Sequence, residues 1–345
     1  MNGKVRSFGC TAGGKETVLI RLENANGMFA EVSNYGATLV SLGVPGKKGD
    51  ILDVVLGFDD VGGYEKSRYY MGATIGRHAG QIKNGCFHLG GREYLLVIND
   101  HDHTMHGGPD GFHRQVFRWR AGGETVEFFY HSPDGEAGFP GNLELLVRYR
   151  LSGENELTIE YNAHCDCDTV LNMTNHAYFN LSGEETIHNH LLCINADEYT
   201  EIDEQGLPTG KILPVKNTPY DFTVLRSVGE SIADDDPQLK WAHGYDHNWV
   251  LSRKNDGELR FACELADEQR LRTMKLYTNQ PGLQMYTGNY MDGLEQGKRG
   301  VVYSFRGALC LEPQLFPNGM EHPEFPSPVL HAGENYHFLS VYKFL

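Results

Sequence analysis

The sequence is short of positive charge. Its 345 residues hold 30 lysines and arginines against 46 aspartates and glutamates, which gives a formal net charge of −16 at pH 7. A chain with this balance repels the phosphate backbone of nucleic acids and the anionic head groups of lipids. The composition therefore argues against nucleic acid and membrane surfaces as partners, and it favours a neutral small molecule.

Long apolar runs and a secretion signal are also lacking. No apolar segment approaches the roughly 20 residues that a membrane-spanning helix needs. The opening stretch, MNGKVRSFGCTAGGKETVLI, contains neither an apolar core nor a cleavage-site pattern. The cysteine count is seven, an odd number. Without a secretion signal an odd count favours reduced thiols, so we expect a cytoplasmic protein.

Helical periodicity is scarce, whereas strand periodicity recurs. Apolar and polar residues alternate over 126–130, 143–151 and 156–161, which is the period-2 pattern of half-buried strands. The one helix that the sequence predicts is short and lies within 233–241, where acidic residues precede Pro237. The chain therefore reads as a series of strands with almost no helix.

Glycine and turn pairs are abundant. Glycine accounts for 41 of 345 residues, above the roughly 7% of an average protein. Pairs typical of tight turns separate the strand patterns, at Asn26-Gly27, Asn84-Gly85, Asp256-Gly257 and Asp292-Gly293. No βαβ alternation, internal repeat or linker composition marks a domain boundary. We predict an all-β protein with a single large sandwich-type domain over residues 1–345.

Two clusters raise the question of a metal. The stretch HDHTMHGG, residues 101–108, gives His101 and His103 the H-x-H spacing of metal ligands. The sequence Cys165-Asp166-Cys167 could supply half of a zinc site, but no second cysteine pair follows at zinc spacing. An exposed loop for the histidines and a strand or its edge loop for the cysteines are the preferred interpretations, so we predict no metal site.

Residues suited to acid/base chemistry occur inside apolar strand patterns. His176 and Tyr178 are two apart in TNHAYFN, so they share one face of an extended segment. Asp246 lies among aromatic residues in GYDHNW, and Glu312 ends the apolar run ALCLE. Taken alone, each fits a hydrogen-bonded core histidine or a strand-end acid. Sequence order does not show that they meet.

Together these strings resemble the aldose 1-epimerase (galactose mutarotase) family. The motifs run in the family's order from about Val54 to Pro328: IGRHAGQI, TMHGG, SPDGEAGFPG, NMTNHAYFNLSG, LPTG, GYDHNW, TNQPGLQMYTGN and LCLEPQLFPN. Each motif is weak, but the ordered set is specific. The resemblance implies a galactose-mutarotase-like β-supersandwich with an open sugar cleft on one sheet. It also implies an isomerase that interconverts the α and β anomers of a free aldose such as galactose or glucose.

The resemblance also implies roles for particular residues. Glu312 matches the general base, His176 the general acid, and His106 a second histidine near the ring oxygen. Further substrate contacts are expected from Asp246, Gln280, Tyr178 and the position of Gln81. A flat apolar face for the sugar could come from Tyr178, Trp249 or Tyr286.

The chemistry that these roles imply consists of proton transfers. Mutarotation opens a cyclic hemiacetal and closes it on the other face. Glu312 would take the proton of the C1 hydroxyl while His176 gives one to the ring oxygen, and the roles reverse on closure. We therefore expect neither a metal nor an organic cofactor. Because His176 must be protonated to donate, we also expect Asp246 or Glu312 to raise its pKa.

One position departs from the family pattern. Gly80-Gln81 stand where the family has an Asn-Arg pair. Gln81 keeps donor capacity but lacks the charge and the planar fork of arginine, and Arg77 lies roughly 13 Å away along an extended strand. The preferred sugar is therefore left open. So are two alternatives on the same fold: a non-catalytic carbohydrate-binding or sensor protein, and a mutarotase of a modified or phosphorylated sugar, which would need a cationic pocket.

Overall fold

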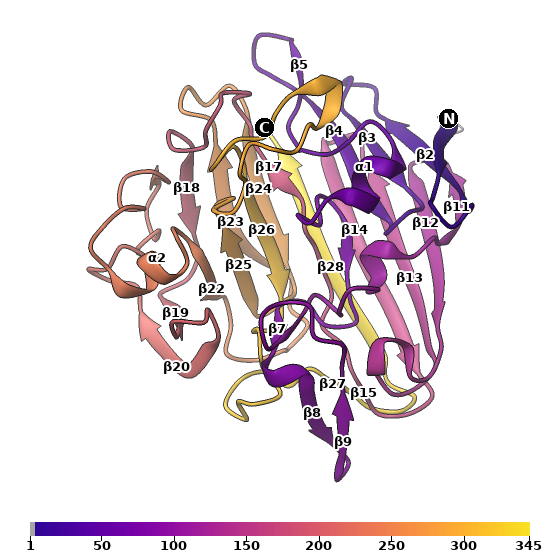
Figure 1. The fold of residues 1–345 in the computed structure, drawn as a ribbon. Coiled ribbons are helices and arrows are strands. Elements are labelled where there is room, and N and C mark those ends of the chain that lie inside the picture. The colour runs from indigo at the N-terminus through magenta and orange to yellow at the C-terminus, as the bar shows by residue number, and fades with distance from the viewer. Residues whose placement is uncertain (1–3) are drawn as a thin grey trace.

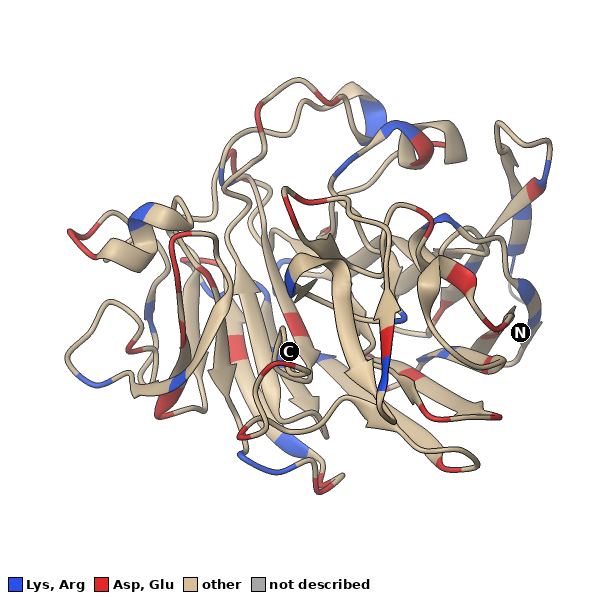
Figure 2. Ribbon diagram, turned by 60° about the horizontal axis from the view of Figure 1, so that its bottom comes forward, with Lys and Arg blue, Asp and Glu red and all other residues tan. Residues whose placement is uncertain are grey.

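The computed structural model describes residues 4–345, and strands predominate in it. The α-helices in this part of the chain are α1 (Val61–Lys66) and α2 (Pro237–Trp241), accompanied by short 3-10 turns at Lys83–Gly85, Phe112–Arg114, Glu136–Gly138 and Lys298–Gly300. None of the helices found between residues 4 and 345 is long and apolar enough to cross a membrane. Acidic and basic residues are interspersed over the loops and strands (Figure 2).

The largest sheet has nine strands. Their order is β11 (Arg118–Gly122), β12 (Thr125–Ser132), β13 (Leu143–Leu151), β14 (Glu156–Cys165), β28 (Asn335–Phe344), β24 (Thr273–Thr278), β23 (Arg260–Ala266), β18 (Leu191–Ile194) and β21 (Arg226–Ser227). The C-terminal strand β28, yellow in Figure 1, lies between β14 and β24. This last strand therefore joins the part of the sheet formed by β11–β14 to the part formed by β24, β23, β18 and β21.

The predicted alternation is confirmed in this sheet. From Leu143 to Leu151 every second residue of β13 is buried, and on β14 the buried positions include Leu157, Ile159 and Tyr161. These side chains belong to the main hydrophobic core. Burying each one stabilises the fold by roughly 1.5–3 kcal/mol relative to leaving it exposed, which is why a period-2 pattern produces a strand with one inner face.

A six-stranded sheet packs on the same core. Its order is β17 (Tyr178–Phe179), β26 (Leu309–Gln314), β25 (Gly282–Tyr286), β22 (Asp246–Val250), β19 (Glu198–Ile202) and β20 (Pro208–Pro214). Leu283 and Leu311 from this sheet share the core with Leu276 and Tyr342 from the nine-stranded sheet. Each sheet therefore packs one face against the other in a shared core, and the opposite face of the six-stranded sheet does not take part in that packing.

The N-terminal region adds a third sheet of five strands in sequence order: β1 (Lys4–Cys10), β2 (Glu16–Glu23), β3 (Phe29–Ser33), β4 (Thr38–Pro45) and β5 (Ile51–Asp53). Short strand pairs complete the fold: β6 (Thr74–Ile75) with β16 (Thr174–Asn175), β7 (Gln81–Ile82) with β10 (Thr104–Met105), β8 (Cys86–Leu89) with β9 (Arg92–Leu95), and β15 (Thr169–Val170) with β27 (Val329–Leu330). The β6–β16 pair places Thr74–Ile75 alongside Thr174–Asn175.

The helix predicted within 233–241 is present as α2, and it starts where the proline pattern indicates. The Asp236 carboxylate accepts hydrogen bonds from the backbone N–H groups of Gln238 and Leu239, and Pro237 occupies the first turn. Helix α1 was not predicted from the sequence. It has six residues, two of them glycine, so it carries no helical periodicity.

Candidate active site

A cleft of about 880 Å³ lies over the six-stranded sheet. Side chains of β19, β22, β25 and β26 form part of its lining, and loops supply the rest. The loop residues come from 68–70, 80–81, 99–106, 204–208, 241–243 and Tyr290. The cleft is therefore built on a rigid sheet and bordered by segments from distant parts of the chain.

Strand register decides which polar groups meet in the cleft. Glu312 on β26 lies directly opposite Gln284 on β25, which lies opposite Asn248 on β22. All three side chains line the cleft. Their neighbours Leu309 and Leu311 point the other way into the core, because side chains alternate along a strand.

A second row of residues crosses the sheet beside the first. Asp246 pairs with Tyr286, Tyr286 with Cys310, and Cys310 with Tyr178. An oxygen of the Asp246 carboxylate accepts a hydrogen bond of 2.7 Å from Nε2 of Gln284, which links the two rows. The predicted Asp246 and Tyr178 therefore lie on the same cleft as Glu312.

His176 lies between β16 and β17 and is fixed by its own backbone. Its N–H donates to the carbonyl of Ala73, and its carbonyl accepts from the N–H of Gly72. The imidazole stacks on Tyr178 with ring centres 5.1 Å apart. Its Nε2 lies 3.8 Å from Oε1 of Glu312. The two residues matched to the acid and the base are thus brought together from positions far apart in the chain.

His106 is held in a left-handed backbone conformation, with φ of 54°. Its Nδ1 accepts a hydrogen bond of 3.2 Å from the backbone N–H of Gly80, so in the neutral ring Nε2 carries the proton. The ring lies 5.2 Å from that of His176. The next residue, Gly107, has a φ of 81°, and a Cβ there would lie 2.1 Å from the carbonyl oxygen of Gly76. This close approach requires glycine.

Burial sets the proton affinities in the cleft. It lowers the pKa of His176 to about 4 and raises the pKa of Glu312 well above its usual range, with the Asp246 charge adding to the second effect. Burial also raises the pKa of Asp246 to about 6. The expectation that a carboxylate raises the pKa of His176 is therefore wrong, because loss of hydration outweighs attraction. Both shifts favour the neutral forms of His176 and Glu312.

The charged residues of the cleft are mainly acidic. In the part of the chain that the structure describes, Arg68 is the single lysine or arginine in the cleft lining, and its guanidinium is paired with Asp292. Asp100, Asp102 and Glu204 lie on the same lining. A phosphate group would meet a negative field with no free cation, so the phosphorylated-sugar alternative gains no support.

Gln81 lines the cleft with a partly exposed side chain. Arg77 does not. Its buried guanidinium donates to the hydroxyl of Ser132 and to the carbonyls of Pro140 and Gly141. Arg77 therefore does not take the place of the arginine expected at position 81, as its distance along the strand predicts.

Gln280 is not part of the cleft lining, unlike the other predicted contacts. It is buried, and its Nε2 donates to the hydroxyl of Tyr336. Gln284 lines the cleft instead. The Pro281-Gly282 step explains the difference: β25 begins at Gly282, so its register places Gln284 opposite Glu312 while Gln280 precedes the strand.

The expected aromatic contacts differ in whether they reach the cleft. Trp249 is fully buried and donates from Nε1 to the carbonyl of Tyr220, so of the three expected aromatic contacts only Tyr178 and Tyr286 line the cleft. The cleft lining also includes Tyr70, Trp241 and Tyr290, which the sequence argument missed. Asn248 and Gln314, which the sequence argument missed, also line the cleft. Their polar character in apolar strands, in phase with Glu312, was the available signal.

The two histidines of the H-x-H pattern have different environments. His101 is exposed and contacts Asp100, whereas His103 is buried and its Nδ1 accepts from the N–H of Asn84. Neither histidine belongs to a group of three or more ligand-type side chains within 4.8 Å of one another in residues 4–345. Two such groups occur there: Cys165, Asp166 and Cys167, and His176, Cys310 and Glu312.

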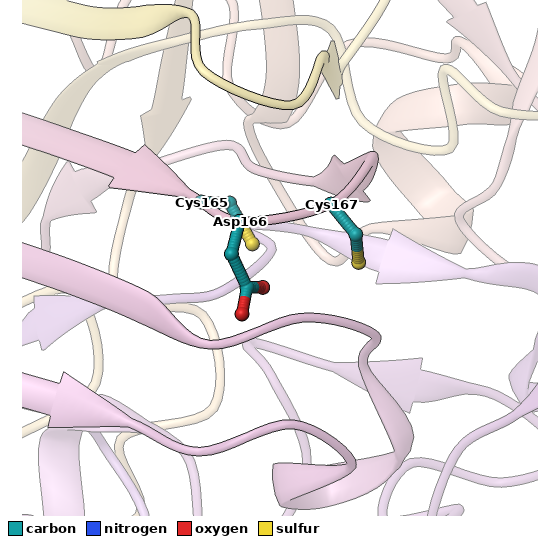
Figure 3. A group of neighbouring side chains, drawn as sticks. All are labelled: Cys165, Asp166 and Cys167. Carbon is teal, nitrogen blue, oxygen red and sulfur yellow. The ribbon is translucent and has the colours of Figure 1, made fainter.

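The first of these groups lies outside the cleft, at the end of β14 (Figure 3). Both oxygens of the Asp166 carboxylate accept hydrogen bonds from Asn142, one from its backbone N–H and one from its side-chain amide. The carboxylate therefore has a structural role in joining two loops. This matches the preferred interpretation of a strand and its edge loop.

The fold and the cleft together define an all-β protein with a buried histidine–glutamate pair on an open cleft. The chain belongs to the aldose 1-epimerase family, whose sequence profile matches residues 18–343. Among its relatives, galactose mutarotase from Mus musculus is 39% identical over 319 residues, 92% of this chain and 91% of the relative. Aldose 1-epimerase from Escherichia coli K12 is 36% identical over 333 residues, 95% of each chain.

Solved structures agree with the predicted supersandwich. An aldose epimerase homologue from C. elegans superposes with a TM-score of 0.88 at 33% identity, over 95% of this chain and 99% of the other. Galactose 1-epimerase from Lactobacillus acidophilus gives a TM-score of 0.84 at 30% identity, over 100% and 99%. The galactose-mutarotase-like fold is thereby confirmed.

Proposed function

We propose that the protein interconverts the α and β anomers of a free aldose of the galactose or glucose type, with Glu312 and His176 as the base and the acid. Glu312 removes the proton of the C1 hydroxyl while Nε2 of His176 protonates the ring oxygen. The open-chain aldehyde turns about its C1–C2 bond, and the reverse transfers close the ring on the other face. The observation that carries this proposal is the 3.8 Å approach of the two groups in the cleft.

Burial lowers the pKa of His176 to about 4 and raises that of Glu312, so burial favours the neutral form of each member of the pair. The neutral pair and the ion pair contain the same number of protons. Transfer from Glu312 to His176 therefore produces a base and an acid without exchange with solvent. Each member of such a pair is typically worth roughly 10²–10⁴ in rate.

The other cleft residues bind and orient the sugar. His106 stays neutral because burial lowers its pKa well below the usual value, so its Nε2–H is a donor toward the ring oxygen. Asp246 and Gln284 bond hydroxyl groups, with Gln284 taking the role first given to Gln280. Tyr178 and Tyr286 offer apolar faces to C–H edges. The names of the relatives support galactose as a substrate.

A direct test measures anomer exchange by polarimetry or by NMR exchange spectroscopy across a panel of free aldoses. We expect acceleration of galactose or glucose mutarotation by the wild-type protein and loss of this acceleration in His176→Asn. Saturable sugar binding without any acceleration would favour the non-catalytic sensor instead. Both members of the acid/base pair are present, which argues against that alternative.

We also propose a cytoplasmic location and a small-molecule sugar as the functional partner. The odd cysteine count and the net charge of −16 support these proposals. Fractionation of the native host, with detection of the protein in the membrane or secreted fraction as the contrary result, tests the location.

A further inference from the structure

One contact at the active site has no part in the mechanism above. The sulfur of Cys310 lies 3.4 Å from Nδ1 of His176, on the side of the ring away from the cleft-facing Nε2. Both side chains are buried. At this separation a thiol and an imidazole nitrogen are hydrogen-bonded, with the donor set by the tautomer.

The placement follows from the strand. Cys310 and Glu312 are two apart on β26, so their side chains share the face that turns away from Leu309 and Leu311. The same strand thus supplies the base for one side of the His176 ring and a thiol for the other.

We propose that Cys310 is a positioning residue whose thiol holds Nδ1 of His176 through the catalytic cycle, so that Nε2 is the nitrogen that exchanges a proton with the ring oxygen. This inference rests on the proposed function of His176. It concerns the orientation and tautomer of the ring, and Cys310 itself touches no reacting atom.

The cycle shows why a thiol suits this place. The imidazolium carries a proton on each nitrogen, and Nδ1–H donates to the sulfur. After Nε2 gives its proton to the ring oxygen, Nδ1–H remains on the sulfur and the Nε2 lone pair faces the new hydroxyl. On closure Nε2 takes the proton back. The thiol keeps its own proton throughout, because burial raises the pKa of Cys310 well above its usual range.

A stronger acceptor would serve less well. A carboxylate behind Nδ1 would stabilise the imidazolium and make His176 a weaker acid. Sulfur is a weak acceptor, so it orients the ring without retaining the charge. The lowered pKa of His176 is in keeping with this arrangement.

The experiment compares Cys310→Val, which keeps similar bulk without a hydrogen bond, with Cys310→Ser, which keeps a donor and acceptor. Loss of the partner that orients a metal-ligating imidazole typically costs about 10–100-fold, and we expect an effect on the same scale for this imidazole. We expect Cys310→Val to lower kcat at least roughly tenfold while KM changes less than about twofold, and Cys310→Ser to recover part of kcat. Cys263→Val is the matched control, because Cys263 is an equally buried free thiol in the core and does not line the cleft.

A second readout separates orientation from simple packing. In the empty wild-type protein, ¹⁵N NMR of the imidazole should report the Nδ1–H tautomer of His176, assigned by its loss in His176→Asn. In Cys310→Val the signal should move to a mixture of tautomers, and in Cys263→Val it should not move.

The contrary outcomes are distinct. A folded Cys310→Val protein with wild-type kcat and an unchanged tautomer overturns the positioning role while leaving His176 as the acid. A fully active His176→Asn protein overturns the proposed function itself, and the role of Cys310 with it. If Cys310→Val fails to fold, the tautomer and kcat of Cys310→Ser decide, since a wild-type kcat with an altered tautomer contradicts the inference.

Discussion

Strands β14 and β26 differ in what their second face meets. Along β14 buried positions alternate with partly or fully exposed ones, whereas all six residues of β26 are buried. On β14 the acid Glu160 is partly exposed, and its carboxylate is hydrogen-bonded to Arg148 and His337. On β26 the acid Glu312 is buried, and one of its carboxylate oxygens has no hydrogen-bond partner.

The difference teaches where to look for function in a β protein. In both strands successive side chains point to opposite faces, and in both the acid lies on the face opposite the one that enters the main core. A surface pair such as that of Glu160 contributes little, whereas a buried polar atom without a partner typically costs about 1–3 kcal/mol. The unpartnered oxygen of Glu312, which lines the cleft, is in keeping with the proposed role of this residue toward the sugar.

The largest difference between the two strands is expected when the acid of each is replaced by glutamine. Glu312→Gln and His176→Asn should each lower the mutarotation rate by roughly 10²–10⁴, because each removes one proton-transfer group. Glu160→Gln, the matched change on β14, should leave kcat and KM near wild type. Steady-state kinetics with circular dichroism as a folding check measure this. A Glu312→Gln enzyme as fast as Glu160→Gln would contradict the assignment of the base.

The pH dependence gives a second, smaller effect. As a carboxylate, Asp246 is proposed to accept hydrogen bonds from sugar hydroxyls, and burial raises its pKa to about 6. It becomes protonated as the pH falls through that value, so KM should rise by about fivefold between pH 6 and pH 5. The rate constant kcat should fall only below about pH 4, where His176 and Glu312 together take up a second proton.

Full kinetic profiles from pH 3.5 to 9 test this prediction, with Asp246→Asn as the control in which the rise in KM near pH 6 should vanish. A kcat that falls together with the rise in KM near pH 6 would show that Asp246 acts in the chemical step as well as in binding.

Gln81→Arg tests how the cleft is tuned. A charged donor contributes about 1.5–3 kcal/mol and a neutral one about 0.5–1.5, and 1.4 kcal/mol corresponds to a tenfold change. The variant should therefore lower KM for galactose by roughly tenfold with little change in kcat. A submillimolar wild-type KM and no gain in the variant would show that another residue makes the contact.

Restoring the family's asparagine at position 80 as well, by Gly80→Asn, would complicate this test. The φ of Gly80 is 76°, which asparagine tolerates better than most residues, but a Cβ there would lie 2.8 Å from Cβ of Pro317. The single variant Gln81→Arg therefore isolates the effect of charge from that of a backbone shift.

Metal removal should have the smallest effect. Proton transfer between Glu312, His176 and the sugar requires no Lewis acid, so treatment with a chelator should leave the rate unchanged. Elemental analysis of the purified protein and a rate assay before and after chelation measure this. A stoichiometric metal whose removal abolishes turnover would contradict it, and the group formed by His176, Cys310 and Glu312 would be the first place to search.

The sequence predicted the long strands well and the short ones poorly. Strands β13 and β14 have nine and ten residues, enough for alternation to appear. Strands such as β6 and β16 have two residues each, and their pairing spans about a hundred positions. Nothing local specifies such pairs, because their stability comes from the tertiary contacts around them.

The site shows a similar division. Motifs identified Glu312, His176, His106 and Asp246, which all line the cleft. The motif pointed to Gln280, which does not line the cleft, because the start of β25 decides which glutamine faces it. The pKa of His176 was expected to rise because the sequence names charged neighbours but does not measure burial, and burial is the larger influence here.

The pairing of Glu312 with Gln284 also ties folding to activity. A slip of β26 by one residue would turn Leu311 into the cleft and Glu312 into the apolar interior. The contacts that complete the core and those that assemble the acid/base pair are thus formed by the same alignment of two strands. Recovery of enzymatic rate during refolding should therefore track the native alignment of β25 and β26, which makes a mutarotation assay a reporter of correct strand registration.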